Sequence, residues 1–108
     1  MGDPRAARNV RRLRDIAPGP AEVPGVEVRQ LTQADHVARK VIEVEPGRST
    51  PFHTHAHGQE AVIVSGVGAL RLEDREEALE PGDVLSVDPD EPHAVVNRGS
   101  AVLAVRLP

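Results

Sequence analysis

The chain has 108 residues, a length that suits one domain with one hydrophobic core. It contains no cysteine, which excludes disulfides, zinc–thiolate sites, iron–sulfur ligation by cysteine and thiol catalysis. Tyrosine and tryptophan are absent and Phe52 is the only aromatic residue, so a tyrosine base and stacking platforms for single-stranded nucleic acid are excluded. The net charge of −4 also argues against a nucleic-acid partner, because an acidic domain repels the phosphate backbone.

The first fifteen residues differ from the rest in charge. They hold five arginines against two aspartates, whereas the remainder holds eight basic and fifteen acidic residues. Prolines and glycines between residues 18 and 25 end any helix that begins there. We therefore expect a flexible Arg-rich arm or linker over residues 1–25 and one domain over 26–108. A solvated tail is the simplest interpretation of the arginines, and contact with RNA or another anionic surface is the alternative.

No apolar stretch is long enough to span a membrane, and the N-terminus lacks the apolar region of a secretory signal. We therefore expect a cytoplasmic protein with no membrane partner. The absence of cysteine is consistent with a reducing compartment.

Short β-like runs separated by Gly, Pro and acidic turns begin at Val26. Turn signals recur about every 8–12 residues without a helical period, which predicts an all-β sandwich or barrel. The predicted strands, in chain order, cover residues 26–31, 38–44, a strand starting at 53–55, then 60–65, 68–72, 78–79, 84–87, 93–97 and 101–107.

Four of the five histidines lie in two segments, residues 47–60 and 82–97. His53 and His55 are two residues apart, so on a strand both imidazoles point to the same face. Two adjacent imidazoles form half of a metal site, and His93 on a later strand could supply a third nitrogen. Gln59 or Glu60 could add an oxygen. The sequence therefore predicts a metal site inside a small β-barrel.

These spacings resemble the cupin superfamily. The first motif of that family reads G-x5-H-x-H-x(3,4)-E-x6-G, and Gly47, His53, His55, Gln59 and Gly66 stand at its positions. The resemblance covers about residues 41–107. It implies a double-stranded β-helix, the jelly-roll barrel of the cupins.

The second cupin motif reads G-x5-P-x-G-x2-H-x3-N. Gly82, His93 and Asn97 match it, whereas Asp88 and Asp90 replace the usual Pro and Gly. We expect the turn before His93 to survive these replacements. Asn97 is interpreted as a turn residue or a partner of the ligands, not as a ligand.

Gln59 stands where cupins usually have glutamate, and Glu60 would require a gap of four residues. The standard six-residue spacing to Gly66 favours Gln59 as the fourth ligand. Strand parity also places residues 59, 61, 63 and 65 on one face, with the small Ala61 and Ser65 near the cavity. Some small cupins resemble this chain in using three His and one Gln.

Three neutral imidazoles and an amide oxygen suit one divalent transition metal: Fe, Mn, Ni, Cu or Zn. An uncharged cage leaves the ion its full charge and attracts anionic ligands, and open coordination positions are typical of catalytic sites. We expect a small metal-dependent cupin enzyme acting on a small anionic or dicarbonyl substrate chelated to the metal. The chemistry is of isomerase, lyase or cyclase type, or that of a dioxygenase. The alternative is a non-catalytic metal- or small-molecule-binding module.

His57, Glu60 and Lys40 are the candidate catalytic acid–base residues. His57 also fits a loop or rim position, and Lys40 also fits a solvated strand edge. The predicted cavity walls are small and aliphatic, drawn from Ala61, Ile63, Ser65, Val84 or Leu85, Val95, Leu103 and Val105. We expect a homodimer that pairs through residues 10–31 and an outer face with Val62 and Val64.

Overall fold

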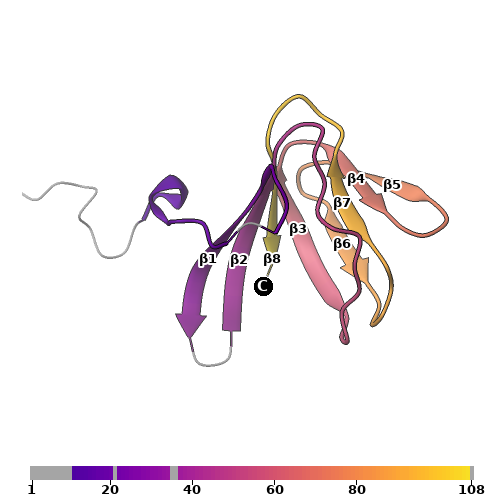
Figure 1. Ribbon diagram of the computed structural model, residues 1–108, viewed down its shortest axis with the longest axis horizontal. Helices are drawn as coiled ribbons and strands as arrows, with labels where there is room; N and C mark the ends of the chain where they lie inside the picture. The colour runs from indigo at the N-terminus through magenta and orange to yellow at the C-terminus, as the bar shows by residue number, and fades with distance from the viewer. Residues whose placement is uncertain (1–10, 21, 35–36, 108) are drawn as a thin grey trace, which may run out of the picture.

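The computed structural model describes residues 11–20, 22–34 and 37–107 (Figure 1). This part of the chain is almost entirely β-structure, as predicted, with one 3-10 turn, η2 (Leu13–Asp15). No helix in it is long and apolar enough to cross a membrane. The strands are β1 (Val26–Ala34), β2 (Val37–Val44), β3 (Gln59–Ser65), β4 (Gly68–Arg71), β5 (Glu76–Leu79), β6 (Val84–Val87), β7 (Ala94–Asn97) and β8 (Leu103–Leu107).

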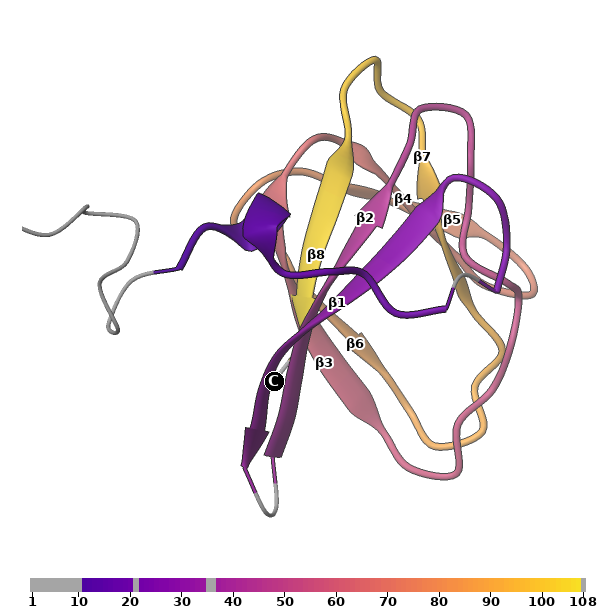
Figure 2. The same ribbon diagram turned by 60° about the vertical axis from the view of Figure 1, so that its left-hand side comes forward.

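The strands form two antiparallel sheets on opposite sides of a jelly-roll barrel (Figure 2). The larger sheet has the order β1-β2-β8-β3-β6, and the smaller has the order β5-β4-β7. Neighbours in these sheets come from distant parts of the chain, since β8 lies between β2 and β3. The expected double-stranded β-helix is therefore confirmed.

The core follows from the alternation of side chains along the central strands. Val44 pairs with Leu103 and Ile42 with Val105, so that these residues share the inner face of the large sheet. Val44 and Leu103 are fully buried, and Ile63 of β3 is 1 % exposed beside them. Leucines of the small sheet complete the same cluster, which fixes the distance between the two sheets.

One parity prediction is wrong. Ser65 is exposed and does not face the cavity. The pairing of β3 with β8 shifts between Ile63 and Ser65, where Ser65 lies opposite Ala104. This β-bulge places an extra residue in the strand and ends the two-residue period that holds for Gln59, Ala61 and Ile63.

The predicted strand at 53–55 is replaced by a single bridge. The His53 N–H donates to the His93 carbonyl, and the His93 N–H donates to the His53 carbonyl, both at 3.0 Å. His53 is the one residue of this segment that forms a bridge, and residues 53–55 belong to neither sheet.

Asn97 closes the end of the barrel opposite to this bridge. Its Nδ2 donates to the carbonyls of Val44 and Ala101, both at 2.8 Å, and its Oδ1 accepts from the Gly99 N–H at 2.8 Å. The residue is 2 % exposed. The turn role expected for Asn97 is confirmed.

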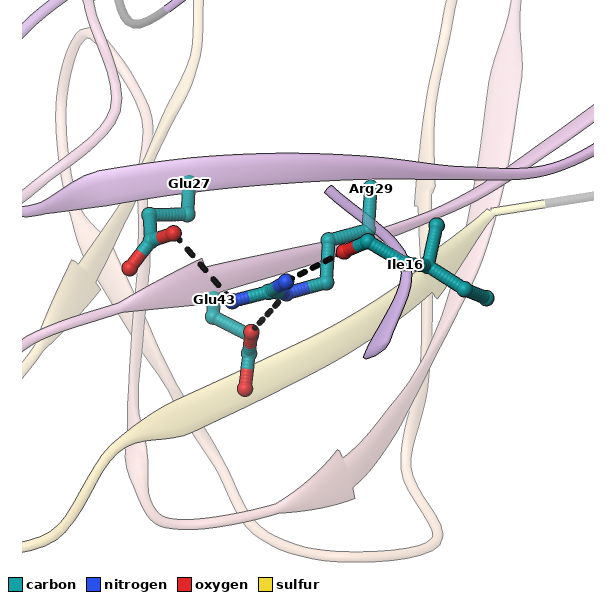
Figure 3. Close-up of polar contacts among 4 residues, drawn as sticks. All are labelled: Ile16, Glu27, Arg29 and Glu43. Atoms are coloured by element: carbon teal, nitrogen blue, oxygen red, sulfur yellow. Dashed lines mark hydrogen bonds and ion pairs between the residues drawn. The ribbon is translucent and has the colours of Figure 1, made fainter. Parts of the chain in front are cut away.

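Arg29 joins the N-terminal segment to the outer face of the large sheet (Figure 3). Its guanidinium donates to Glu43 at 2.8 Å, to Glu27 at 3.2 Å and to the carbonyl of Ile16 at 2.5 Å. The Gly19 N–H donates to the Val28 carbonyl at 2.8 Å beside this cluster. The described part of the expected arm thus contacts β1, while residues 1–10 and 21 lie outside the described residues.

The outer face also carries exposed apolar residues. Val62 and Val64 are 38 % and 54 % exposed, which agrees with the outward direction predicted for them. The homodimer that they were expected to support remains a prediction.

Candidate metal centre

Three histidines from the two motifs converge at one end of the barrel. His53 and His55 lie in the segment before β3, and His93 lies immediately before β7. Each offers a ring nitrogen, and these three nitrogens lie within 4.8 Å of one another. The ring centroids are 4.5 Å apart for His53 and His55, 4.8 Å for His53 and His93, and 5.2 Å for His55 and His93.

Backbone carbonyls orient two of the rings. His53 Nδ1 is 2.5 Å from the Pro51 carbonyl oxygen, and His93 Nδ1 is 2.8 Å from that of Glu91. A carbonyl only accepts, so each Nδ1 must carry a proton. In the neutral imidazole the lone pair is then on Nε2, the arrangement found in metal-ligating histidines.

The third ring, His55, faces the same point. Its Nε2 is 3.0 Å from Nε2 of His53. Burial, and then the neighbouring histidines, lower the pKa of His55 below its ordinary value and so favour the neutral ring that a metal requires. Nitrogens bound to one zinc ion at about 2.0–2.1 Å are at most about 4 Å apart, so small ring rotations bring all three into range.

The loop of the second motif is hydrogen-bonded to the backbone of the first motif. Asp90 has a φ of 60°, the left-handed conformation, and occupies the position that is usually Gly in cupins. Asp tolerates this conformation better than most residues. The Asp90 N–H donates to the His55 carbonyl at 2.7 Å. The loop therefore keeps the geometry that the motif requires despite the replacement.

A cavity of about 90 Å³, partly open to solvent, lies against the three histidines. Its walls are mainly aliphatic, and no carboxylate of a described residue lines it. Gln59, Ala61, Leu85, Val95 and Val105 line it as the sequence predicted, and the remaining wall residues are Lys40, Ile42, Thr50 and Leu107.

Gln59 and Glu60 point to opposite sides of β3. Gln59 lines the cavity, whereas Glu60 is exposed and accepts a hydrogen bond from Ser86 Oγ at 3.3 Å on the outer side. Parity therefore holds in this part of the strand, and only the Gln59 amide lies on the side of the histidines. The sequence did not decide whether Val84 or Leu85 faces the cavity. Leu85 lines it, and Val84 is 61 % exposed.

The three acid–base candidates separate in the same way. Lys40 lines the cavity, whereas His57 and Glu60 are exposed and do not. Thr50, which was not predicted, also lines it. Its Oγ1 accepts from the Val95 N–H at 2.8 Å, which leaves the hydroxyl proton available as a donor. No residue-type pattern marks Thr50 in the sequence, because its place depends on a contact with β7.

The residues present fit a divalent transition metal. The three imidazoles form a donor set of the kind that such ions bind, and Gln59 lies in the same cavity wall. The oriented Nδ1 protons and the adjacent cavity are the two features that separate this cluster from a group of surface histidines.

Known proteins share this fold. The polyketide cyclase RemF from Streptomyces resistomycificus is 27 % identical with a TM-score of 0.78, over 89 % of this chain and 74 % of that one. A predicted oxalate decarboxylase from Thermotoga maritima is 23 % identical with a TM-score of 0.76, over 89 % and 93 % of the two chains.

One curated protein matches a shorter region. The (R)-mandelonitrile lyase of Granulicella tundricola is 40 % identical over 58 residues, which is 53 % of this chain and 44 % of the lyase. The match thus spans less than half of that relative's length. The model of the cupin domain matches residues 40–106, which hold both histidine motifs and most of the barrel. This chain therefore belongs to the cupin family.

Proposed function

We propose that this protein is a metal-dependent cupin enzyme that performs redox-neutral lyase or cyclase chemistry on a small hydroxy or carbonyl compound. The observation that carries the proposal is the convergence of three imidazoles, two with their Nδ1 atoms held by carbonyls, on one end of an aliphatic cavity. A closed structural site would need no adjoining cavity.

His53, His55 and His93 would hold the metal, with Gln59 as the fourth donor. A divalent ion bound there would polarise a carbonyl or hydroxyl oxygen of the substrate. The wall residues Ile42, Leu85 and Val105 would surround the carbon skeleton and exclude water from it.

The overall reaction is balanced without an electron acceptor. A carbon–carbon bond of the carbon that carries the hydroxyl is cleaved. The products are a carbonyl compound and a protonated leaving group, and the reverse addition forms the bond. The proton of the hydroxyl replaces the broken bond on the leaving group. Of the three acid–base candidates, only Lys40 lines the cavity.

Two relatives support this reaction class. The mandelonitrile lyase and the polyketide cyclase are both more than 25 % identical to this chain. Both are named for reactions that are redox-neutral. A dioxygenase would use the same donor set with different substrates. The neutral Gln59 favours the Lewis-acid alternative, because the ion keeps its full positive charge.

The first test is elemental analysis of protein purified without chelators, for wild type and for a His53→Ala/His93→Ala variant. We expect about one Fe, Mn, Ni, Cu or Zn per wild-type chain and none in the variant. Glu60→Gln is the matched control, because Glu60 lies on the opposite side of β3.

The second test is turnover of hydroxynitriles and of other compounds with a C–C bond beside a hydroxyl, with and without oxygen. We expect turnover by the metal-loaded protein under anaerobic conditions. Turnover that requires oxygen would instead indicate a dioxygenase. Stoichiometric metal without turnover of any kind would indicate a binding module.

A further inference from the structure

Lys40 occupies a position in β2 where the alternation calls for an apolar residue. Lys40, Ile42 and Val44 share the inner face of this strand, and Val44 is fully buried in the core. Lys40 pairs with Leu107, which is 5 % exposed and also lines the cavity. The lysine is half-buried and belongs to the same wall as the three histidines.

The ammonium of Lys40 has no anionic partner among the side chains that the structure describes. Arg29, Arg71, Arg75 and Arg98 each form an ion pair with a carboxylate, whereas no ion pair or side-chain hydrogen bond joins the Lys40 ammonium to a described residue. These paired cations lie outside the cavity. A cation that lines a cavity without a carboxylate in the described wall is available to an anion that enters from solvent.

The charges of the wall favour an anion as well. Besides its three imidazoles and the Gln59 amide, the described wall holds one Lys or Arg side chain, Lys40, and no carboxylate. A bound divalent ion would add two further positive charges. A cavity whose charges all have one sign concentrates ligands of the other sign.

The size and chemistry of the wall narrow the ligand further. A cavity of about 90 Å³ is small, which suits a short carbon skeleton. The apolar lining is aliphatic throughout the described wall. Thr50 contributes a hydroxyl proton that a ligand oxygen could accept.

We propose that Lys40 is a specificity-determining residue that binds a carboxylate, and that the substrates are short aliphatic carboxylates with a hydroxyl or carbonyl group at C2. The placement of the C2 hydroxyl or carbonyl oxygen next to the histidines rests on the proposed function. Binding of the carboxylate by Lys40 rests on the wall alone. Lys40 therefore acts as a cation that positions the substrate, and its ammonium does not have to lose a proton.

The test compares lactate with lactamide, two molecules of nearly the same shape that differ in charge. Dissociation constants are measured by calorimetry on metal-loaded wild type, Lys40→Met, Lys40→Arg and Arg39→Met. Arg39 is the matched control, because it is the neighbouring cation with an exposed side chain. A metal ion alone also prefers a carboxylate, so the informative quantity is the change in the lactate-to-lactamide affinity ratio.

We expect Lys40→Met to reduce this ratio about tenfold, the usual effect of losing one charge-assisted hydrogen bond. Lys40→Arg should retain most of the ratio, and Arg39→Met should retain all of it. An unchanged ratio in Lys40→Met, or an equal loss of affinity for both molecules, would overturn the proposal. It would indicate that the ammonium extends to solvent and only its alkyl chain contacts the cavity.

A second measurement separates this proposal from the proposed function. In the metal-free protein, lactate should shift the methyl NMR signals of Ile42 and Leu107, and Lys40→Met should abolish these shifts while the thermal midpoint stays within a few degrees. Shifts that persist in Lys40→Met contradict the role of Lys40 whatever the metal content. Absence of metal from wild type would contradict the proposed function and leave this result standing.

Discussion

Two buried polar residues lie at the two ends of β7, and they differ in how many hydrogen-bond partners they have. Asn97 at one end directs both amide protons and its oxygen to backbone groups at the end of β2 and in the loop between β7 and β8. His93 at the other end is almost as buried, at 4 % exposure, yet only its Nδ1 has a backbone partner. A fully paired buried group stabilises the fold, whereas one with a free lone pair next to a cavity is available for chemistry.

The cations of the first two strands repeat this contrast. Arg29, on the outer face of β1, donates to Glu43, Glu27 and the carbonyl of Ile16. Lys40, on the inner face of β2, has no such partner among the described residues. The difference in pairing, more than the difference in burial, separates residues that hold the structure together from residues that meet a ligand.

His93→Ala should have the largest effect on the metal. Loss of one imidazole should lower metal affinity more than about 100-fold, because removal of groups that merely support ligands already costs about 10–100-fold. The free energy of unfolding of the metal-free protein should fall by only about 1–2 kcal/mol, since the ring borders an existing cavity. Elemental analysis and urea unfolding measure the two effects. Retained stoichiometric metal would exclude His93 as a ligand.

Asn97→Ala should show the reverse pattern. The substitution removes three hydrogen bonds around buried backbone groups, and we expect the free energy of unfolding to fall by about 2–4 kcal/mol. Metal affinity of the folded protein should stay within about threefold of wild type. The same two measurements apply. A loss of metal affinity as large as in His93→Ala would show that Asn97 and the histidines act as one unit.

Gln59→Glu should sharpen the assignment of the fourth donor. A carboxylate in place of the amide adds one negative charge beside the histidines, so metal affinity should rise about tenfold and lactate affinity should fall. Glu60→Gln is the control and should change neither by more than about twofold, since Glu60 faces solvent. Calorimetric titration with Zn²⁺ and Mn²⁺ measures both variants. Equal effects in the two would mean that Gln59 is not close to the ion.

Asp90→Gly should have the smallest effect. Gly adopts the left-handed conformation without the strain of a side chain, so the free energy of unfolding should rise by about 0.5 kcal/mol. Asp88→Gly, at a residue without positive φ, should instead lower it by about as much. Urea unfolding of the two variants tests the pair. A loss of stability in Asp90→Gly would indicate that the Asp90 side chain itself supports the loop.

Much of this arrangement was predictable from the sequence. Turn residues and two-residue alternation predicted most strands, and the two histidine motifs predicted which imidazoles converge. Gln59 and Ala61 were placed correctly on the inner face, because both precede the bulge in β3. Ser65 was not, since the bulge is set by pairing with β8, a strand about forty residues away that local periodicity does not encode.

Residues that depend on contacts between distant segments were also missed. Thr50 lies in the wall because Val95 donates to its hydroxyl, and no spacing in the sequence indicates that contact. The expected strand at 53–55 has alternating residues but forms only one bridge, between His53 and His93, and the next contact is a single hydrogen bond from the Asp90 N–H to the His55 carbonyl. Pairing partners, and not propensities, decide these positions.

The bridge between His53 and His93 bears on the order of folding and metal binding. These two residues are separated in the chain by β3, β4, β5 and β6, so the site exists only after four strands have been placed. We therefore expect any ion that binds there to enter a barrel that has already folded, and not to nucleate its folding. Loading should follow refolding as a separate, concentration-dependent kinetic phase, and the ion should slow unfolding far more than it speeds folding.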